Sequence, residues 1–291
     1  VRAFALEADY GGCEAINRYI HGEGGTAAEA LSATGFAIYR TEEMENLVEW
    51  MRDYNASATQ GDDLRFYGFD MEQRAYTYRY LLEALQKANI DTADFEKMWN
   101  SEANTYADGY TVEQRTEIIT AVKEQLPPDD VQAIHFADIL LQNIELGKYI
   151  DDSGELNAQR DRMMAENTLW ILQQEQARGN SRILISGHNN HIMQCENAGT
   201  PVLGSLLAEN LGDGYFAIGT DFYKSVCNLP KPYTGKRITH TFYSYDPLAK
   251  ASKKCGFDVS FLDFSKVPEG SALTEYTSNN ISMGSLGESY S

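Results

Sequence analysis

The stretch RAFALEADYGG, residues 2–12, decides the fold class of this 291-residue chain. Its short apolar run ends in acidic residues and a glycine pair, which predicts a buried strand followed by a loop. Two later runs share this design: LRFYGFD ends at Asp70, and RILISG leads directly into His188. Further strands are predicted at YFAIGTDF, RITHTFYSY, DVSFLDF and ISMGSL, residues 215–222, 237–245, 258–264 and 281–286.

Helical patterns fill the segments between these runs. CEAINRYIHG carries apolar residues at helical spacing and stops at Gly22, and TEEMENLVEWMRDYN predicts an amphipathic helix that Thr41 can cap. Residues 71–178 carry almost no strand pattern. They predict a run of helices at about 71–89, 93–100, 112–126, 129–149 and 155–178.

Together these patterns predict an α/β fold with a mixed, mainly parallel sheet, flanking helices and a large helical insertion. We expect residues 1–70 and 180–291 to form the α/β core, with residues 71–179 packed on it as the insertion. The whole chain can then be one domain. A division into two domains near residues 71 and 180 is the alternative.

The composition argues against several classes of partner. The chain has 24 Lys and Arg against 43 Asp and Glu, a formal net charge of −19. A negative field of this size repels phosphate backbones and anionic lipid, so we expect neither nucleic-acid nor membrane partners. The four cysteines form no CxxC pair, which gives no support to a zinc knuckle. Unpaired cysteines favour the cytoplasm slightly over export.

Candidate functional residues follow the predicted strands. In open α/β sheets, ligands bind beyond the carboxyl ends of the strands. Glu7 leaves the first strand, Asp70 the second, and His188 and His191 the third. We therefore expect these carboxylates and imidazoles to converge on one cleft.

The two histidines admit more than one interpretation. Their spacing places His188 and His191 on one face if a helix begins there, and imidazole suits a general base near neutral pH. A polar exit from the strand, in which the side chains satisfy backbone groups, is equally compatible with the spacing. A metal site made by both histidines and Glu7 is a third interpretation.

The predicted helix at 155–178 places polar groups on its apolar stripe. Arg160 and Asn167 share a face with methionines and Ile171. A buried guanidinium needs a carboxylate or a ligand, so Arg160 predicts a salt bridge or a substrate contact. Asp161 and Glu166 are expected on the solvated flank.

Several familiar catalytic motifs are absent from the sequence. It contains no GxSxG, P-loop, GxGxxG or HExxH motif. A hydrolase on this chain would therefore work without a serine nucleophile elbow. Water activated by histidine is the leading mechanism.

The order of motifs resembles the erythromycin esterase family, which includes proteins described as succinoglycan biosynthesis proteins. FALEADYGGCEAINRYIHG, RFYGFDMEQ, RDRMMAENTLWIL, ILISGHNNHI and LGDGYFAIGTDF occur in the family's order, from about Phe4 to Gly287. The resemblance implies a mixed α/β fold with a helical portion. It also implies hydrolysis of a small-molecule ester, macrolide or saccharide-like substrate without metal or other cofactor.

The resemblance also implies roles for particular residues. Glu7 matches the glutamate of the family's ALEAD strand, His188 and His191 match its histidine pair, and Arg160 lies in its RD-containing helix. We expect Glu7, His188 and His191 to be catalytic, and Arg160 and Asp70 to bind the substrate. The alternative is a non-catalytic member that binds a glycan or another small molecule.

One motif of the family has no counterpart. The family's principal base lies in a GE-x-S/T-H-G motif upstream of the ALEAD strand, and HGE at His21 has neither its order nor its place. Val1 directly precedes a strand, so we expect an N-terminally truncated product rather than a relative without this base. A companion N-terminal fragment or a homodimer would then cover the exposed groove.

Overall fold

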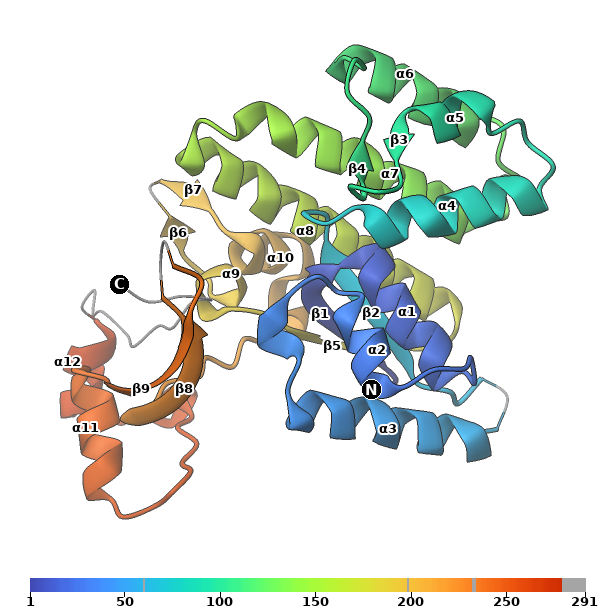
Figure 1. The fold of residues 1–291 in the computed structure, drawn as a ribbon. Helices are drawn as coiled ribbons and strands as arrows, with labels where there is room; N and C mark the ends of the chain where they lie inside the picture. Colours follow the sequence, from blue (N-terminus) through green and yellow to red (C-terminus); the bar gives the residue numbers. More distant parts are fainter. Residues whose placement is uncertain (60, 198, 232–233, 279–291) are drawn as a thin grey trace. The chain divides into compact units, whose positions relative to one another are not determined.

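The computed structural model describes residues 1–59, 61–197, 199–231 and 234–278 (Figure 1). The chain divides into two compact units, Val1–Ala217 and Ile218–Ser291. The strand predicted at 281–286 lies outside the described residues. Among the residues that are described, no helix has the length and apolar character needed to cross a bilayer.

The main sheet of the first unit has, within the described residues, three parallel strands in the order β2-β1-β5. The central strand β1 (Ala3–Asp9) pairs on one side with β2 (Arg65–Asp70), where Leu6 lies opposite Gly68, and on the other with β5 (Ile183–Ser186). The three carboxyl ends consequently share one edge. The prediction of an α/β fold with a parallel sheet is confirmed.

The chain passes from β1 into a helix without a loop, so the predicted loop at the glycine pair is wrong. Helix α1 (Tyr10–Ile20) begins directly after Asp9, whose carboxylate accepts a hydrogen bond from the Gly12 backbone N–H at 2.7 Å. A Cβ atom on Gly11 would lie 2.2 Å from the backbone nitrogen of Thr77. The glycine pair therefore allows close packing between α1 and its neighbours.

Helices α2 (Ala27–Ser32) and α3 (Glu42–Ser57) pack with α1 into one apolar layer against the sheet. The Thr41 hydroxyl accepts a hydrogen bond from the Met44 backbone N–H, which confirms the predicted cap of α3. The buried residues of this layer and the sheet are Leu6, Ala8, Cys13, Ile16, Tyr19, Ile20, Ala27, Ala30, Leu31, Val48, Met51 and Phe66.

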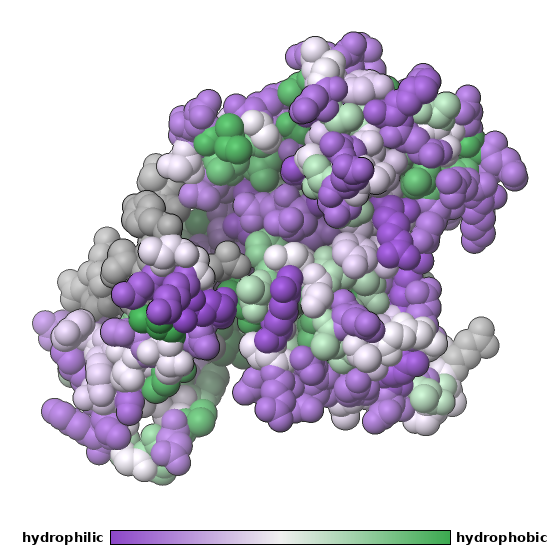
Figure 2. All heavy atoms as spheres, in the orientation of Figure 1, coloured by the Kyte–Doolittle hydropathy of each residue, from purple (hydrophilic) through white to green (hydrophobic). Residues whose placement is uncertain are grey.

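The predicted helical segment is present between β2 and β5. Its helices are α4 (Ala75–Lys87), α5 (Ala93–Lys97), α6 (Val112–Lys123), α7 (Val131–Leu146) and α8 (Ser153–Ala177). Between α5 and α6 the chain forms a small hairpin, β3 (Trp99–Asn100) and β4 (Thr105–Tyr106). Figure 2 shows a mainly hydrophilic surface over this segment, interrupted by small apolar areas.

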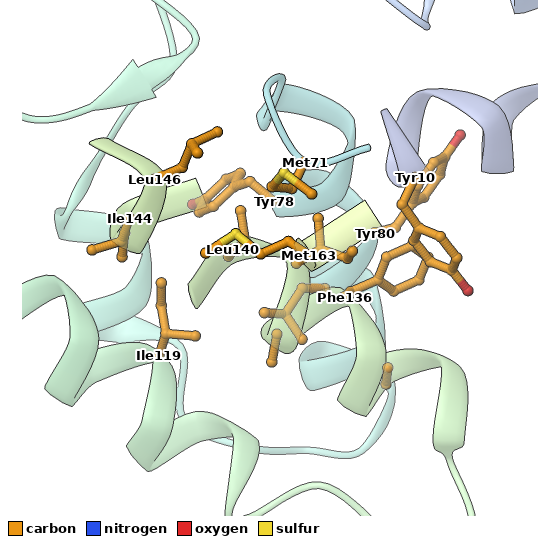
Figure 3. Packing of buried hydrophobic residues seen from close by; sticks show 14 of the residues in the cluster. Tyr10, Met71, Tyr78, Tyr80, Ile119, Phe136, Leu140, Ile144, Leu146 and Met163 are labelled. Carbon is orange, nitrogen blue, oxygen red and sulfur yellow. The ribbon is translucent and has the colours of Figure 1, made fainter. Parts of the chain in front are cut away.

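A second apolar cluster joins these helices to the sheet (Figure 3). In this cluster Tyr78 of α4 stacks on Trp99, with ring centroids 4.1 Å apart. Side chains alternate between the two faces of a strand, so Ala5 and Phe69 face this cluster while Leu6 faces the other. β1 and β2 therefore form a buried middle layer between the two clusters, whereas β5 is partly exposed, with Leu184 at 54%. The carboxyl edge of the sheet holds the polar groups.

Beyond β5 the first unit continues with short elements. These are α9 (Asn189–Ile192), β6 (Glu196–Asn197), β7 (Thr200–Pro201) and α10 (Leu203–Leu211). Short 3₁₀ helices occur at Ala37–Tyr39, Gly147–Tyr149 and Gly212–Gly214, and in the second unit at Phe264–Lys266.

The second unit contains a separate antiparallel hairpin, β8 (Lys224–Pro230) and β9 (Arg237–Tyr243), followed by α11 (Pro247–Lys254) and α12 (Ala272–Thr277). Within the described residues, β8 and β9 form a two-stranded sheet of their own. The strands predicted at 215–222 and 258–264 are wrong, because both segments lack regular strand structure. Apolar alternation forms a strand only where a neighbouring strand supplies hydrogen bonds and packing.

Candidate active site

The shared edge of the three strands brings Glu7 and Asp70 close to the turn after β5. The Glu7 carboxylate accepts a hydrogen bond from the His188 backbone N–H at 2.7 Å, across 181 residues of sequence. Its own backbone carbonyl accepts a hydrogen bond from the Tyr39 hydroxyl at 2.7 Å. Both the side chain and the backbone of Glu7 are therefore held by hydrogen bonds.

Gly187 makes this contact sterically possible. A Cβ atom at this position would lie 2.9 Å from Glu7 Oε2, closer than such atoms approach in proteins. The last residue before His188 is thus restricted to glycine if the carboxylate is to stay in place. The glycine that ends the RILISG run shapes the site as well as the turn.

Arg160 reaches this edge from α8 and lies among three carboxylates. Its Nε donates to Asp70 Oδ1 at 3.2 Å and its Nη2 to Asp70 Oδ2 at 2.5 Å. Nη2 also donates to Glu7 Oε1 at 3.2 Å, and Glu72 Oε2 lies 3.5 Å away. Burial lowers the pKa of Arg160, but the charge and hydrogen bonds of Asp70, with Glu72 and Glu7, raise it above its ordinary value.

His191 of α9 faces the same cluster. Its Nδ1 lies 2.8 Å from Asp161 Oδ1, and its Nε2 lies 3.4 Å from Arg160 Nη1 and 3.5 Å from Glu7 Oε1. Burial lowers the pKa of His191, but the hydrogen bond to Asp161 and the charges of Glu7 and Asp161 outweigh this and raise it. Protonated His191 is thus stabilised by the surrounding carboxylates.

His188 caps the same short helix. Its Nδ1 accepts a hydrogen bond from the Asn190 backbone N–H at 3.3 Å, and its ring centroid lies 6.4 Å from that of His191. Because Nδ1 accepts, the hydrogen of neutral His188 is on Nε2. The two histidines therefore lie near each other with different hydrogen-bonding roles.

The sequence profile described as "Erythromycin esterase" matches residues 1–291. The chain belongs to the erythromycin esterase family. A search of curated proteins gives no match.

Three solved structures share the fold of this chain. A Bacillus cereus protein matches with a TM-score of 0.69 and 20% identity, over 84% of this chain and 64% of its own. A succinoglycan biosynthesis protein matches with a TM-score of 0.67 and 20% identity, over 82% of this chain and 62% of its own. An erythromycin esterase mutant in its open conformation matches with a TM-score of 0.54 and 16% identity, over 84% of this chain and 68% of its own. The chain spans less than two thirds of the first two structures.

Of the sequence-predicted residues, the erythromycin esterase fold gathers Glu7, Asp70, Arg160 and His191 into direct contact, with His188 bound to Glu7 through its backbone. Two further polar residues of the opening segment, Asp9 and His21, make structural contacts. Asp9 caps α1, and His21 lies at the end of that helix with Nε2 3.1 Å from Asp63.

Asp161 is the residue that the sequence interpretation misplaced. It is 3% exposed and contacts His191, so its expected position on a solvated flank is wrong. Glu166 does lie at the surface, where it accepts a hydrogen bond from Arg162 at 2.6 Å. The helical spacing of Asp161 with the apolar residues Met164 and Ala165 was a signal that this carboxylate is buried.

The donor groups of the site have a geometry that does not resemble a metal centre. Within the described residues, no three His, Cys, Asp or Glu side chains are arranged to hold a metal ion. The Arg160 guanidinium already lies between Glu7 and Asp70. The positive charge between these two carboxylates is therefore the side chain of Arg160 itself.

Proposed function

We propose that this erythromycin esterase family member takes part in hydrolysis of a small-molecule ester or lactone by attack of water. The observation that carries the proposal is the contact set of His191 with Asp161, Glu7 and Arg160. It combines a proton acceptor, a carboxylate partner and a fixed positive charge. Macrolides and saccharide-like esters are the substrate classes suggested by the family and by the succinoglycan biosynthesis protein of similar fold.

The reaction follows from the positions of these groups. Neutral His191 has its hydrogen on Nδ1, which faces Asp161, so Nε2 takes a proton from the attacking water. Water oxygen bonds to the carbonyl carbon, and the N–H donors of Arg160 stabilise the negative oxygen that develops. Collapse of this intermediate breaks the ester bond, and Nε2–H returns its proton to the leaving alcohol.

Glu7 and His188 support this chemistry from the other side. Glu7 Oε1 lies 3.5 Å from His191 Nε2 and stabilises the imidazolium that forms when water is deprotonated. We assign His188 a supporting role through its backbone N–H, which donates to Glu7 and holds this carboxylate beside His191.

The test is turnover of an ester panel by the chain and by single variants. The panel holds macrolide lactones, acylated saccharides and simple aryl esters, with released acid or ring-opened product measured by mass spectrometry. His191→Ala should reduce hydrolysis by at least about 100-fold, because the proton acceptor is lost. His240→Ala, an exposed histidine of β9, is the matched control and should retain activity.

Two results would argue against the proposal. Equal turnover by His191→Ala and the unchanged chain would remove His191 from the mechanism. Tight binding of a panel member without any hydrolysis would favour the non-catalytic binding function instead.

A further inference from the structure

Asp161 joins the candidate base to a separate helix. Its Oδ1 atom lies 2.8 Å from His191 Nδ1 and accepts a hydrogen bond from the Leu203 backbone N–H at 3.0 Å. These donors come from α9 and from the start of α10, whereas Asp161 belongs to α8. One buried carboxylate oxygen therefore connects three elements.

We propose that Asp161 is the positioning residue that fixes the orientation and the tautomer of His191. The inference rests on the proposed hydrolytic function and deepens it. A carboxylate accepts hydrogen bonds but does not donate them, so the His191 nitrogen facing Asp161 must carry hydrogen. The other nitrogen is then the acceptor and faces Glu7 and Arg160.

The packing of α10 keeps this geometry fixed. A Cβ atom on Gly204 would lie 2.2 Å from the Ile192 backbone oxygen, so α10 packs directly on the backbone of α9. The same oxygen accepts a hydrogen bond from Tyr215 at 2.5 Å. Leu203 is fully buried. The backbone beside His191 is therefore held in place by a packed helix.

Asp161 also helps α10 to begin. The residue before this helix, Val202, has no side-chain oxygen to cap it, and the Leu203 N–H binds Asp161 instead. This N–H also determines which atom of residue 161 faces His191. In an Asp161→Asn variant, the Leu203 N–H should keep the amide oxygen facing it and His191. The amide nitrogen is itself a donor and could not accept this hydrogen bond.

The charges around His191 predict how it responds to substitution. Asp161 and Arg160 face it from α8, Glu7 faces it from β1, and His188 lies on its own helix. Asp161→Asn removes one of the two carboxylates that favour the protonated ring but keeps the hydrogen-bond acceptor. Asp161→Ala removes both the charge and the acceptor.

The experiment follows the histidine rings of the whole chain by ¹⁵N-edited NMR as pH is varied. The His191 signals are assigned by their loss in His191→Gln. Asp161→Asn should move the His191 titration midpoint to lower pH with Nδ1 still protonated in the neutral ring. Asp161→Ala should also lose this tautomer preference. Glu166→Gln, a carboxylate-to-amide change on the exposed side of α8, should leave the midpoint unchanged.

Activity provides the second readout. Asp161→Asn should lower hydrolysis on the order of 100-fold and move the acid limb of the pH–rate profile to lower pH. An unchanged His191 midpoint and tautomer in both Asp161 variants would overturn the inference. The NMR result does not depend on turnover, so a shifted midpoint in a chain without hydrolysis would support the positioning role while the proposed function failed.

Discussion

The side-chain amide of Asn167 donates to the backbone carbonyl of Phe69 at 3.1 Å, which joins α8 to the end of β2 beside Asp70. Asn167 also exchanges hydrogen bonds with Gln142 of α7, at 2.9 and 3.1 Å. The residue is 1% exposed. The end of β2 is therefore held by Asn167 of α8, which Gln142 of α7 supports in turn, and these contacts help to position the Asp70 carboxylate that binds Arg160.

Removing this amide should destabilise the chain. Asn167→Ala leaves the buried Phe69 carbonyl and the part-buried Gln142 amide without these partners, so we expect a loss of about 1–3 kcal/mol in the free energy of unfolding. Urea denaturation measures it. Asn157→Ala, on the exposed side of the same helix, should change stability by less than about 0.5 kcal/mol. Equal losses in the two variants would contradict the role given to Asn167.

Arg160→Met should have a larger effect. It leaves Asp70, whose side chain is 0% exposed, as a buried charge without its main cation. Breaking a buried pair in this way typically costs about 3–5 kcal/mol. Arg162→Met is the matched control, because Arg162 pairs with Glu166 at the surface and should contribute at most about 1 kcal/mol. Similar unfolding curves for the two variants would refute the structural part of this assignment.

Gly187→Ala should separate activity from stability. The new methyl group meets Glu7 Oε2 at 2.9 Å, so the carboxylate must move away from the His188 N–H and from Arg160. We expect hydrolysis to fall about 10-fold or more, with a stability loss of about 1–3 kcal/mol from overpacking. Gly147→Ala, where a Cβ atom meets nothing within 4 Å, should leave turnover intact. Full turnover in Gly187→Ala would show that the Glu7 position is unimportant.

The rate of hydrolysis should rise with pH through the titration of His191. Burial lowers the pKa of this ring, but Asp161 and Glu7 raise it to a net value above its ordinary 6.5. Only the neutral ring accepts a proton from water, so activity should be lost as pH falls below this raised pKa. The pH profile of kcat/KM measures it. A rate that stays constant from pH 8 down to pH 5 would exclude His191 as the base.

His135 should make the fold sensitive to acid for a separate reason. This ring stacks on Trp170 at 3.8 Å, and its Nε2 is buried without a hydrogen-bond partner among the described residues. Burial, with the Lys123 charge, lowers the pKa of His135 from 6.5 to about 3. The unfolded chain then binds more protons between these values, so the contribution of His135 to stability is full above pH 6.5 and declines below it.

The contribution of His135 to the free energy of unfolding should fall by up to about 1.4 kcal/mol for each pH unit below pH 6.5. Urea denaturation at pH 7, 6, 5 and 4 measures it, with His135→Phe as the comparison because an aromatic ring keeps the stacking on Trp170. The variant should lose less stability than the unchanged chain over this range. Parallel stability curves for the two proteins would show that His135 does not contribute to the acid response.

The sequence by itself determined most elements of the first unit and the edge of the sheet on which the site forms. Strand patterns before Asp70 and His188, the cap at Thr41 and the helical segment were all predicted from local spacing, because hydrogen-bonding rules and side-chain periodicity act within a few residues. Glu7, Asp70 and His188 were candidates for the same reason. Each lies within two residues of the carboxyl end of a strand, the edge at which open α/β sheets bind ligands.

The tertiary structure alone decided which polar groups meet. Asp161 and Glu166 are both acids on α8, yet one contacts His191 and the other faces solvent, because α9 and α10 pack on only one side of that helix. Arg160 and Glu7 are 153 residues apart. The apolar alternation at 258–264 forms no strand, since strand pairing needs a neighbour that the local sequence does not specify. Contacts between distant elements depend on how whole layers pack, and this packing selects the partners of each charge.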